Sequence, residues 1–294
     1  MPEVKVPNDI IVFQYPFSPY ARRVLWYLEL RGIPYAQCVN PTPASPRPDL
    51  AALGVRYRRI PLMAIGRDIY LDSRLILSTL DSHPSLSSYK PLSTPQSAGI
   101  AMLFDKFSTD SGVFTRAAQL IPLESKIWED EKFQKDREDM TGRSWRKADV
   151  AKARPEALAH MRLAFEAVEA MLNDGREWIA ATREVSLADV EAVWVFDWLL
   201  DMKTLPSDLI SADFFPKTYA WIHRFREALR TARSRNSKPV NLAGSDAVAH
   251  VASASFNATE ALAVVPVDPL RLKEGTRSRC GRSILGAGTG TGAG

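Results

Sequence analysis

The sequence predicts a small mixed α/β sheet covered by helices, then an all-helical bundle, and finally a C-terminal tail. Three observations support this fold class. Within residues 9–85, short apolar runs alternate with a stretch of helical period and a hairpin signal at Gly66. Within residues 92–235, apolar residues recur mainly at helical spacing. The final "GAGTGTGAG" is low-complexity and has too few apolar side chains to build a core.

The first part begins with a buried strand over residues 10–13 and continues into an amphipathic helix. Ser18 and Pro19 have the residue types of an N-cap and a first helical position, and Gly32 is placed to end the helix. Arg22 and Arg23 occupy the side of this helix opposite its apolar stripe. A second strand is expected over residues 35–39.

A hairpin and a capped helix complete the first part. Residues 62–65 and 69–71 read as two strands joined through Gly66. Asp72 then has the short acceptor side chain of a helix N-cap, and the helix is expected to continue to about Asp81. A strand-helix-strand unit favours a parallel pair, whereas the hairpin adds antiparallel strands.

The second part contains one strongly apolar helix, which begins in "SLADVEAVWVFDWLLDM". Ser186 and Asp189 have the spacing of a capping box, with Asp in place of the usual Glu or Gln. Residues 236–294 form a separate C-terminal extension, in which "ALAVVPVDPL" is a candidate strand and the Gly-rich end is expected to be disordered.

Composition restricts the function classes. The 46% hydrophobic and 24% charged residues are typical of a globular protein. The 8 basic and 4 acidic residues after Thr231 account for the net charge of +4, so the neutral body argues against a nucleic-acid partner. No apolar run reaches the roughly 20 residues that a membrane span needs. The N-terminus lacks a signal-peptide pattern, and a cytoplasmic location is expected.

Cysteine and histidine give no support for a metal site. Cys38 and Cys280 are far apart and form neither a metal spacing nor a redox pair. The four histidines are scattered along the chain. We therefore expect no metal cofactor.

Several motifs together resemble the cytosolic glutathione transferases. "SPYARRV", the Ile60-Pro61 pair and "GRDIYLDS" have the order and approximate spacing of the thioredoxin-like domain of that family. "SLADVEAVWVFDWL" is similar to its helical domain. The resemblance covers about residues 9–235, and the C-terminal extension is similar to that of some fungal members.

The resemblance implies a site for glutathione as co-substrate. Ser18 matches the residue whose hydroxyl contacts the glutathione sulfur in serine-using members. Ile60 precedes a proline that is cis in the family, Pro61, and its backbone would pair with the cysteinyl part. Asp72 and Ser73 match the acid-serine pair that holds the γ-glutamyl end.

The physical chemistry agrees with these roles. The thiolate is the nucleophilic form of a thiol, so a hydroxyl donor and a helix N-terminus beside the sulfur favour the reactive species. The N–H groups at the start of the second helix suit a carboxylate, and Asp72 suits an ammonium. Ser18 and Asp72 also have a purely structural interpretation, as ordinary helix N-caps. Tyr15 is the alternative residue for the contact with the glutathione sulfur. Of the two neighbouring arginines, Arg58 and Arg59, one is a candidate for the glycyl carboxylate.

The sequence therefore favours a glutathione transferase-like enzyme that acts on a small electrophile by conjugation, isomerisation or elimination. The first alternative is a non-catalytic binding or assembly protein with the same fold. A second alternative, an RNA- or translation-associated module, is disfavoured by the neutral body. The resemblance also implies a homodimer. Serine at position 18, where thiol-disulfide exchange would need cysteine, argues against glutaredoxin-like activity.

Overall fold

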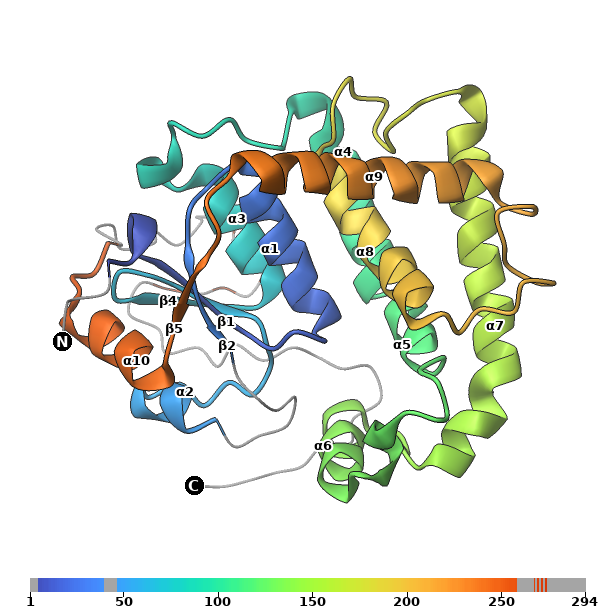
Figure 1. Ribbon diagram of the computed structural model, residues 1–294, viewed down its shortest axis with the longest axis horizontal. Helices are drawn as coiled ribbons and strands as arrows, with labels where there is room; N and C mark the ends of the chain where they lie inside the picture. Colours follow the sequence, from blue (N-terminus) through green and yellow to red (C-terminus); the bar gives the residue numbers. More distant parts are fainter. Residues whose placement is uncertain are drawn as a thin grey trace.

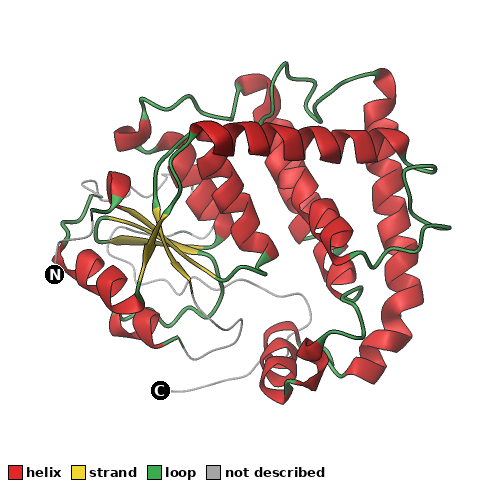
Figure 2. Ribbon diagram, viewed as in Figure 1, coloured by secondary structure: helices red, strands yellow, loops and turns green. Residues whose placement is uncertain are grey.

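The computed structural model describes residues 5–39 and 47–257, together with the single residues 267, 269, 271 and 273. It shows the expected mixed sheet with helices on both faces, joined to a bundle of helices (Figures 1 and 2). Cys280, "ALAVVPVDPL" as a strand and the Gly-rich end lie outside these residues, apart from the single positions named.

The sheet has five strands in the order β4-β3-β1-β2-β5. They are β1 (Ile10–Gln14), β2 (Ala36–Val39), β3 (Leu62–Ile65), β4 (Asp68–Leu71) and β5 (Val240–Leu242). The β1–β2 pair is parallel, and the hairpin strands β3 and β4 are antiparallel. The parallel pair and the hairpin expected from the sequence are both confirmed, with bounds within one residue of prediction.

Two layers of helices cover the sheet. On one face, α1 (Pro19–Arg31) and α3 (Ser73–Ser82) pack on Ile10 and Val12 of β1. On the other face, α2 (Pro48–Ala52) and α10 (Gly244–Ser253) pack on Ile11 and Phe13. Alternate side chains of a strand point to opposite faces, so the first four residues of β1 are all apolar because both faces of the strand are covered.

The end of α1 is fixed by glycine. Gly32 has φ +67°, and its N–H donates to the carbonyl oxygen of Glu29. A left-handed residue with no Cβ satisfies the last carbonyl groups of a helix at little steric cost. The helix stop predicted at Gly32 is confirmed.

The helical part contains α4 (Pro95–Thr109), α5 (Val113–Ala118), α6 (Glu131–Thr141), α7 (Lys147–Met171), α8 (Leu187–Met202) and α9 (Pro216–Arg235). Helix α8 is buried on nearly all sides, as its apolar sequence requires. The predicted capping box is present, because Asp189 accepts from the Ser186 backbone N–H at 2.9 Å and Ser186 caps the helix. Asp189 also accepts from the indole of Trp221 at 2.9 Å.

The chain returns to the sheet after α9. Figure 1 shows the segment leaving the end of α9 and crossing to β5 and α10 beside α2. Strand β5 pairs in parallel with β2, with Val240 opposite Ala36 and Leu242 opposite Cys38. Neither this strand nor α10 was predicted from the sequence, because the three residues of β5 are too few to show a period and α10 consists mainly of small residues.

Candidate functional site

A cavity of about 890 Å³ lies where the sheet part meets the helical part. It is lined from the sheet part by Ser18, Ile60, Pro61, Asp72 and Ser73. Residues of the α4–α5 connection and of α5, α6 and α7 form the opposite wall. All the glutathione-site residues predicted from the sequence therefore line one cavity, and so does the alternative residue Tyr15.

Ser18 is the N-cap of α1. Its Oγ accepts a hydrogen bond from the Ala21 backbone N–H at 3.2 Å, and the side chain is buried. The Ser18 backbone N–H donates to the Tyr15 carbonyl oxygen at 3.0 Å, which closes the turn after β1. A hydroxyl can accept and donate together, so capping leaves the Ser18 proton for a donor role.

Tyr15 follows directly after β1 and is half-buried at the same cavity. Its hydroxyl makes no hydrogen bond to another residue that the structure describes. Tyr15 and Ser18 thus both offer a hydroxyl to the cavity, and their geometry alone does not choose between them.

The Ile60–Pro61 peptide bond is cis, as the resemblance implied. Ile60 is buried among the apolar residues under the sheet, and both residues line the cavity just before β3 begins. The backbone before β3 therefore lines the same cavity as Ser18 and the start of α3.

Asp72 and Ser73 form the N-terminus of α3. Asp72 is the N-cap, and its Oδ1 accepts from the Arg74 backbone N–H at 3.0 Å. Its φ of +73° is unusual for a residue other than glycine, and such strained positions are concentrated at functional sites. Ser73 is buried, with its Oγ accepting from Nη1 of Arg23 at 3.2 Å. That contact leaves the Ser73 hydroxyl proton directed elsewhere.

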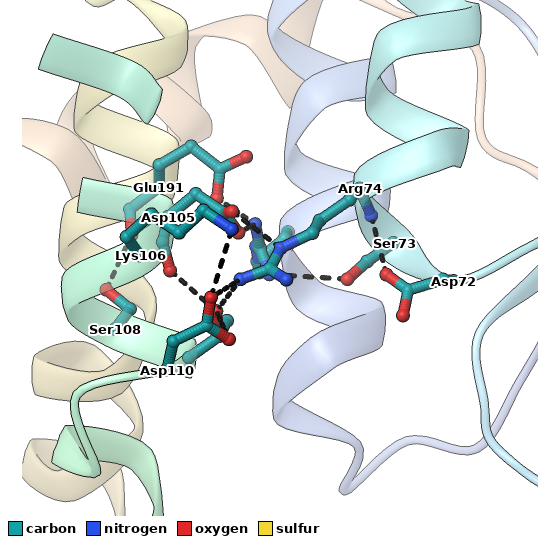
Figure 3. Close-up of polar contacts among 10 residues, drawn as sticks. Asp72, Ser73, Arg74, Asp105, Lys106, Ser108, Asp110 and Glu191 are labelled. Atoms are coloured by element: carbon teal, nitrogen blue, oxygen red, sulfur yellow. Dashed lines mark hydrogen bonds and ion pairs between the residues drawn. The ribbon is translucent and has the colours of Figure 1, made fainter. Parts of the chain in front are cut away.

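An ionic network that includes Arg74, Asp105 and Glu191 lies beside Ser73 (Figure 3). Arg23, which is fully buried, forms ion pairs with Asp105 at 3.0 Å and with Glu191. Arg74 contacts the other Asp105 oxygen at 2.6 Å and Asp110 at 2.8 Å. The network joins α1 and α3 of the sheet part to α4 and α8 of the helical part.

The charged groups of this network shift one another's pKa values. Burial raises the pKa of Glu191 to about 7, with Arg23 opposing the shift and Asp105 adding to it. Burial by itself would lower the pKa of Arg23, but Glu191 and Asp105 outweigh it and the net shift is upward. The position of Ser73 therefore depends on an arginine that stays charged.

Arg23 was missed as a site residue. In the sequence it shares the polar side of α1 with Arg22, and no local signal distinguishes a buried arginine from an exposed one. Arg22 instead binds Asp197 at 2.8 Å, at the joint with α8. The segment "SLADVEAVWVFDWLL" does indicate buried cations nearby, because Glu191 and Asp197 interrupt an otherwise apolar helix and need cationic partners.

Arg74 and Arg58 also have specific partners. Arg74 is held by Asp105 of α4 and by Asp110 at the C-terminal end of that helix. Arg58 is only half-exposed and pairs with Asp136 at 3.6 Å and with Asp139 on α6. Cys38 is buried, and burial raises the pKa of its thiol to about 11, which makes it a poor nucleophile.

Neither a metal cluster nor a membrane-spanning helix is found among the described residues. No group of three or more His, Cys, Asp or Glu side chains in the described part of the chain is arranged to hold a metal ion. None of the helices described is long and apolar enough to cross a bilayer.

Two family models match different parts of the chain. Residues 17–83 match the glutathione S-transferase N-terminal domain, and residues 116–234 match a domain of unknown function (DUF7962). No curated protein matches the chain. The first match includes Ser18, the cis proline and the Asp72-Ser73 pair.

Solved structures show the same fold. A GST-like protein from Pseudomonas syringae has a TM-score of 0.57 at 21% identity, over 90% of this chain and 80% of that one. A rice glutathione S-transferase in complex with glutathione has a TM-score of 0.56 at 15% identity, covering 84% and 97%. A glutathione transferase from Phanerochaete chrysosporium gives 0.54 at 16%, covering 76% and 98%. At these identities the likeness concerns the fold and does not single out a fungal type.

Proposed function

We propose that this chain, which has a glutathione S-transferase-like fold and N-terminal domain, is an enzyme that binds glutathione and activates its thiol for reaction with a small electrophile. One observation carries the proposal. The cavity is lined by a hydroxyl at the start of α1, the backbone segment before β3 and an acid-serine pair at the start of α3. These groups match the thiol, the peptide backbone and the γ-glutamyl end of a single glutathione molecule.

The chemistry assigned to each group follows from its place. The positive end of α1 and a hydroxyl from Ser18, with Tyr15 as the alternative, would stabilise the thiolate. The N–H groups of α3 and the Ser73 hydroxyl would bind the γ-glutamyl carboxylate, while Asp72 would bind the ammonium. Ile60 would offer its backbone to the cysteinyl part.

A non-catalytic, glutathione transferase-like binding or assembly protein is the second candidate. It is favoured by the Ser18 oxygen, which already caps α1 and so has a structural role that does not need a thiol. Under either candidate we expect a cytoplasmic homodimer, on the basis of the family resemblance.

Calorimetric titration of glutathione tests the proposal. The wild-type protein should bind glutathione, and Asp72→Asn, which keeps the capping oxygen but removes the charge, should bind it about tenfold more weakly. Asp208→Ala, at an exposed position outside the cavity, is the matched charge control and should bind normally. No detectable binding of glutathione to the wild-type protein would refute the enzyme and leave a binding or assembly protein that does not use glutathione.

Turnover separates the two candidates. The enzyme should accelerate conjugation of glutathione to 1-chloro-2,4-dinitrobenzene above the uncatalysed rate. A protein that binds glutathione yet leaves this rate, and the rates of other electrophile classes, unchanged would be the binding protein instead.

A further inference from the structure

The lining of the cavity is unusually cationic on both its walls. The described residues lining the cavity include two carboxylates, Asp72 and Asp110, and the following arginines: Arg47, Arg58, Arg59, Arg74, Arg116, Arg137 and Arg143. Small-molecule pockets are ordinarily lined mainly by apolar groups with few charges. The excess of positive charge therefore indicates what kind of second substrate the cavity accepts.

The carboxylates that hold these arginines lie mostly outside the cavity. Arg116 of α5 pairs with Glu156 at 2.5 Å, and Arg58 pairs with Asp136 and Asp139. None of these three carboxylates lines the cavity. They hold the guanidinium groups in place without contributing negative charge to the lining, and each guanidinium has five N–H donors to share.

Two arginines have no such partner. The guanidinium groups of Arg59, half-buried on the sheet side, and of Arg143, exposed just after α6, form no hydrogen bond or ion pair with another described residue. They come from opposite walls of the cavity. Arg59 precedes the cis proline and is near the proposed glutathione residues, whereas Arg143 belongs to the helical wall with Arg116.

The helical wall also supplies an apolar surface. Phe114 of α5 lines the cavity and packs edge-on against Tyr20, with ring centroids 4.8 Å apart. Met140 of α6 lines the same wall. A ligand bound here meets an aromatic ring and a thioether beside guanidinium groups.

We propose that the second substrate is an organic carboxylate, an electrophile whose apolar body packs on Phe114 and Met140 and whose carboxylate pairs with Arg116 and Arg143. The planar guanidinium fork matches a carboxylate in bidentate geometry. Arg59 is then available to the glycyl carboxylate of glutathione. This inference rests on the proposed function, since the second substrate is defined by its reaction with bound glutathione.

A pair of unreactive probes tests the anion site by itself. We expect 3,5-dinitrobenzoate to bind at least about tenfold more tightly than the neutral 3,5-dinitrobenzamide, and increasing salt should reduce this preference. Arg116→Gln and Arg143→Gln should each reduce the preference about threefold or more, as for a pair exposed in part to solvent. Arg183→Gln removes an equal charge from an exposed loop outside the cavity and should leave the preference unchanged.

Equal affinity for the two probes would overturn the inference, as would an equal effect of Arg143→Gln and Arg183→Gln. The binding measurement needs neither glutathione nor turnover. It therefore decides the carboxylate site even if the chain fails to bind glutathione, which would refute only the proposed function.

Turnover gives the second measurement. Glutathione releases its thiol proton to solvent, the sulfur bonds to the ring carbon of 4-chloro-3,5-dinitrobenzoate, and chloride leaves. Relative to the uncatalysed rates, kcat/KM should favour this acid over its methyl ester about tenfold, and Arg143→Gln should lower that ratio. A ratio near one in the wild type, with glutathione bound normally, would contradict the carboxylate assignment alone.

Discussion

Ser18 and Tyr15 present two hydroxyls to one cavity, and their difference lies in their other contacts. Ser18 already accepts the Ala21 N–H, whereas the Tyr15 hydroxyl has no described partner. Either can donate to a sulfur. Their separate removal therefore decides which one stabilises the thiolate.

Ser18→Ala should raise the pKa of bound glutathione and slow turnover, with a smaller effect on glutathione affinity, because Asp72 and Ser73 hold the other end of the ligand. Loss of the cap should also cost about 0.5–2 kcal/mol of stability. Tyr15→Phe keeps the ring and is the matched comparison. Thiolate absorbance, titrated in each complex, gives the pKa. A rise only in Tyr15→Phe would transfer the role to Tyr15, and no rise in either variant would leave it to the helix N-terminus.

Glu191 predicts a pH dependence of stability. Its pKa is raised from 4.5 to about 7 in the folded protein by burial, against the opposing effect of Arg23. Between these values the folded state binds more protons than the unfolded state. The contribution of Glu191 to stability is therefore full below about pH 4.5 and decreases as the pH rises through about 7.

Urea denaturation at pH 5, 6 and 7 measures this contribution. Glu191→Gln, which keeps the side-chain size and does not titrate, should show a shallower loss of unfolding free energy over that range than the wild type. Glu184→Gln, at an exposed carboxyl whose pKa is lowered by Lys90, should follow the wild type. Parallel curves for all three proteins would show that Glu191 does not titrate there.

The site residues that the sequence identified share one property: each terminates or starts an element. Ser18 and Asp72 can be found from capping chemistry, and Pro61 from its place before a strand. Arg23 could not be found this way, because its partners Asp105 and Glu191 are 82 and 168 residues away along the chain. Arg23 is buried because four helices pack around it, and local sequence periodicity does not reveal such packing.

Among the elements, α8 shows how a helix start can depend on one side chain. Asp189 accepts from the backbone N–H groups of Ile179 and Ser186, the Ser186 hydroxyl and the Trp221 indole. Its carboxylate is fully buried. Four donors inside the core therefore rely on a single acceptor group.

Asp189→Ala should lower the free energy of unfolding by about 3 kcal/mol or more, because donors left unsatisfied in the core each cost about 1–3 kcal/mol. Ser186→Ala, which removes only the capping hydroxyl, should cost about 1 kcal/mol. Chemical denaturation of both variants compares them. Equal losses would show that the Asp189 carboxylate contributes no more than the cap.

Element order was the most predictable feature at this scale. The strands, the hairpin and α1 follow from period and from Gly32, Gly66 and Pro34, because these signals act within a few residues. Strand β5 and α10 could not be predicted, since β5 is defined by its pairing with β2, more than 200 residues earlier in the chain.

Across the whole molecule, polar contacts reinforce the joint between the two parts. Arg22 of α1 and Arg226 of α9 share Asp197 and Asp201 of α8. At the end of α9, Asn236 donates to the carbonyl oxygen of Glu29 at 2.6 Å. The last helix thereby directs the chain back to the sheet, where β5 covers the edge of β2.

Truncation tests how much β5 and α10 contribute to stability. Removal of residues 239–294 deletes β5 and α10, exposes the β2 edge and uncovers Leu50, and should lower Tm clearly. A chain ending at Asn257 retains both elements and should melt close to the full-length protein. Removal of residues 281–294 alone should also leave Tm unchanged, as the Gly-rich sequence predicts. Equal Tm values for the first two truncations would show that β5 adds no stability.

The position of β5 has a consequence for synthesis. The other four strands of the sheet leave the ribosome within the first quarter of the chain, but the fifth follows only after every helix of the second part has been made. During translation the β2 edge of the sheet part therefore stays unpaired, and unpaired strand edges are prone to pair with other chains. Completion of the N-terminal sheet and completion of the helical bundle become nearly simultaneous events late in translation.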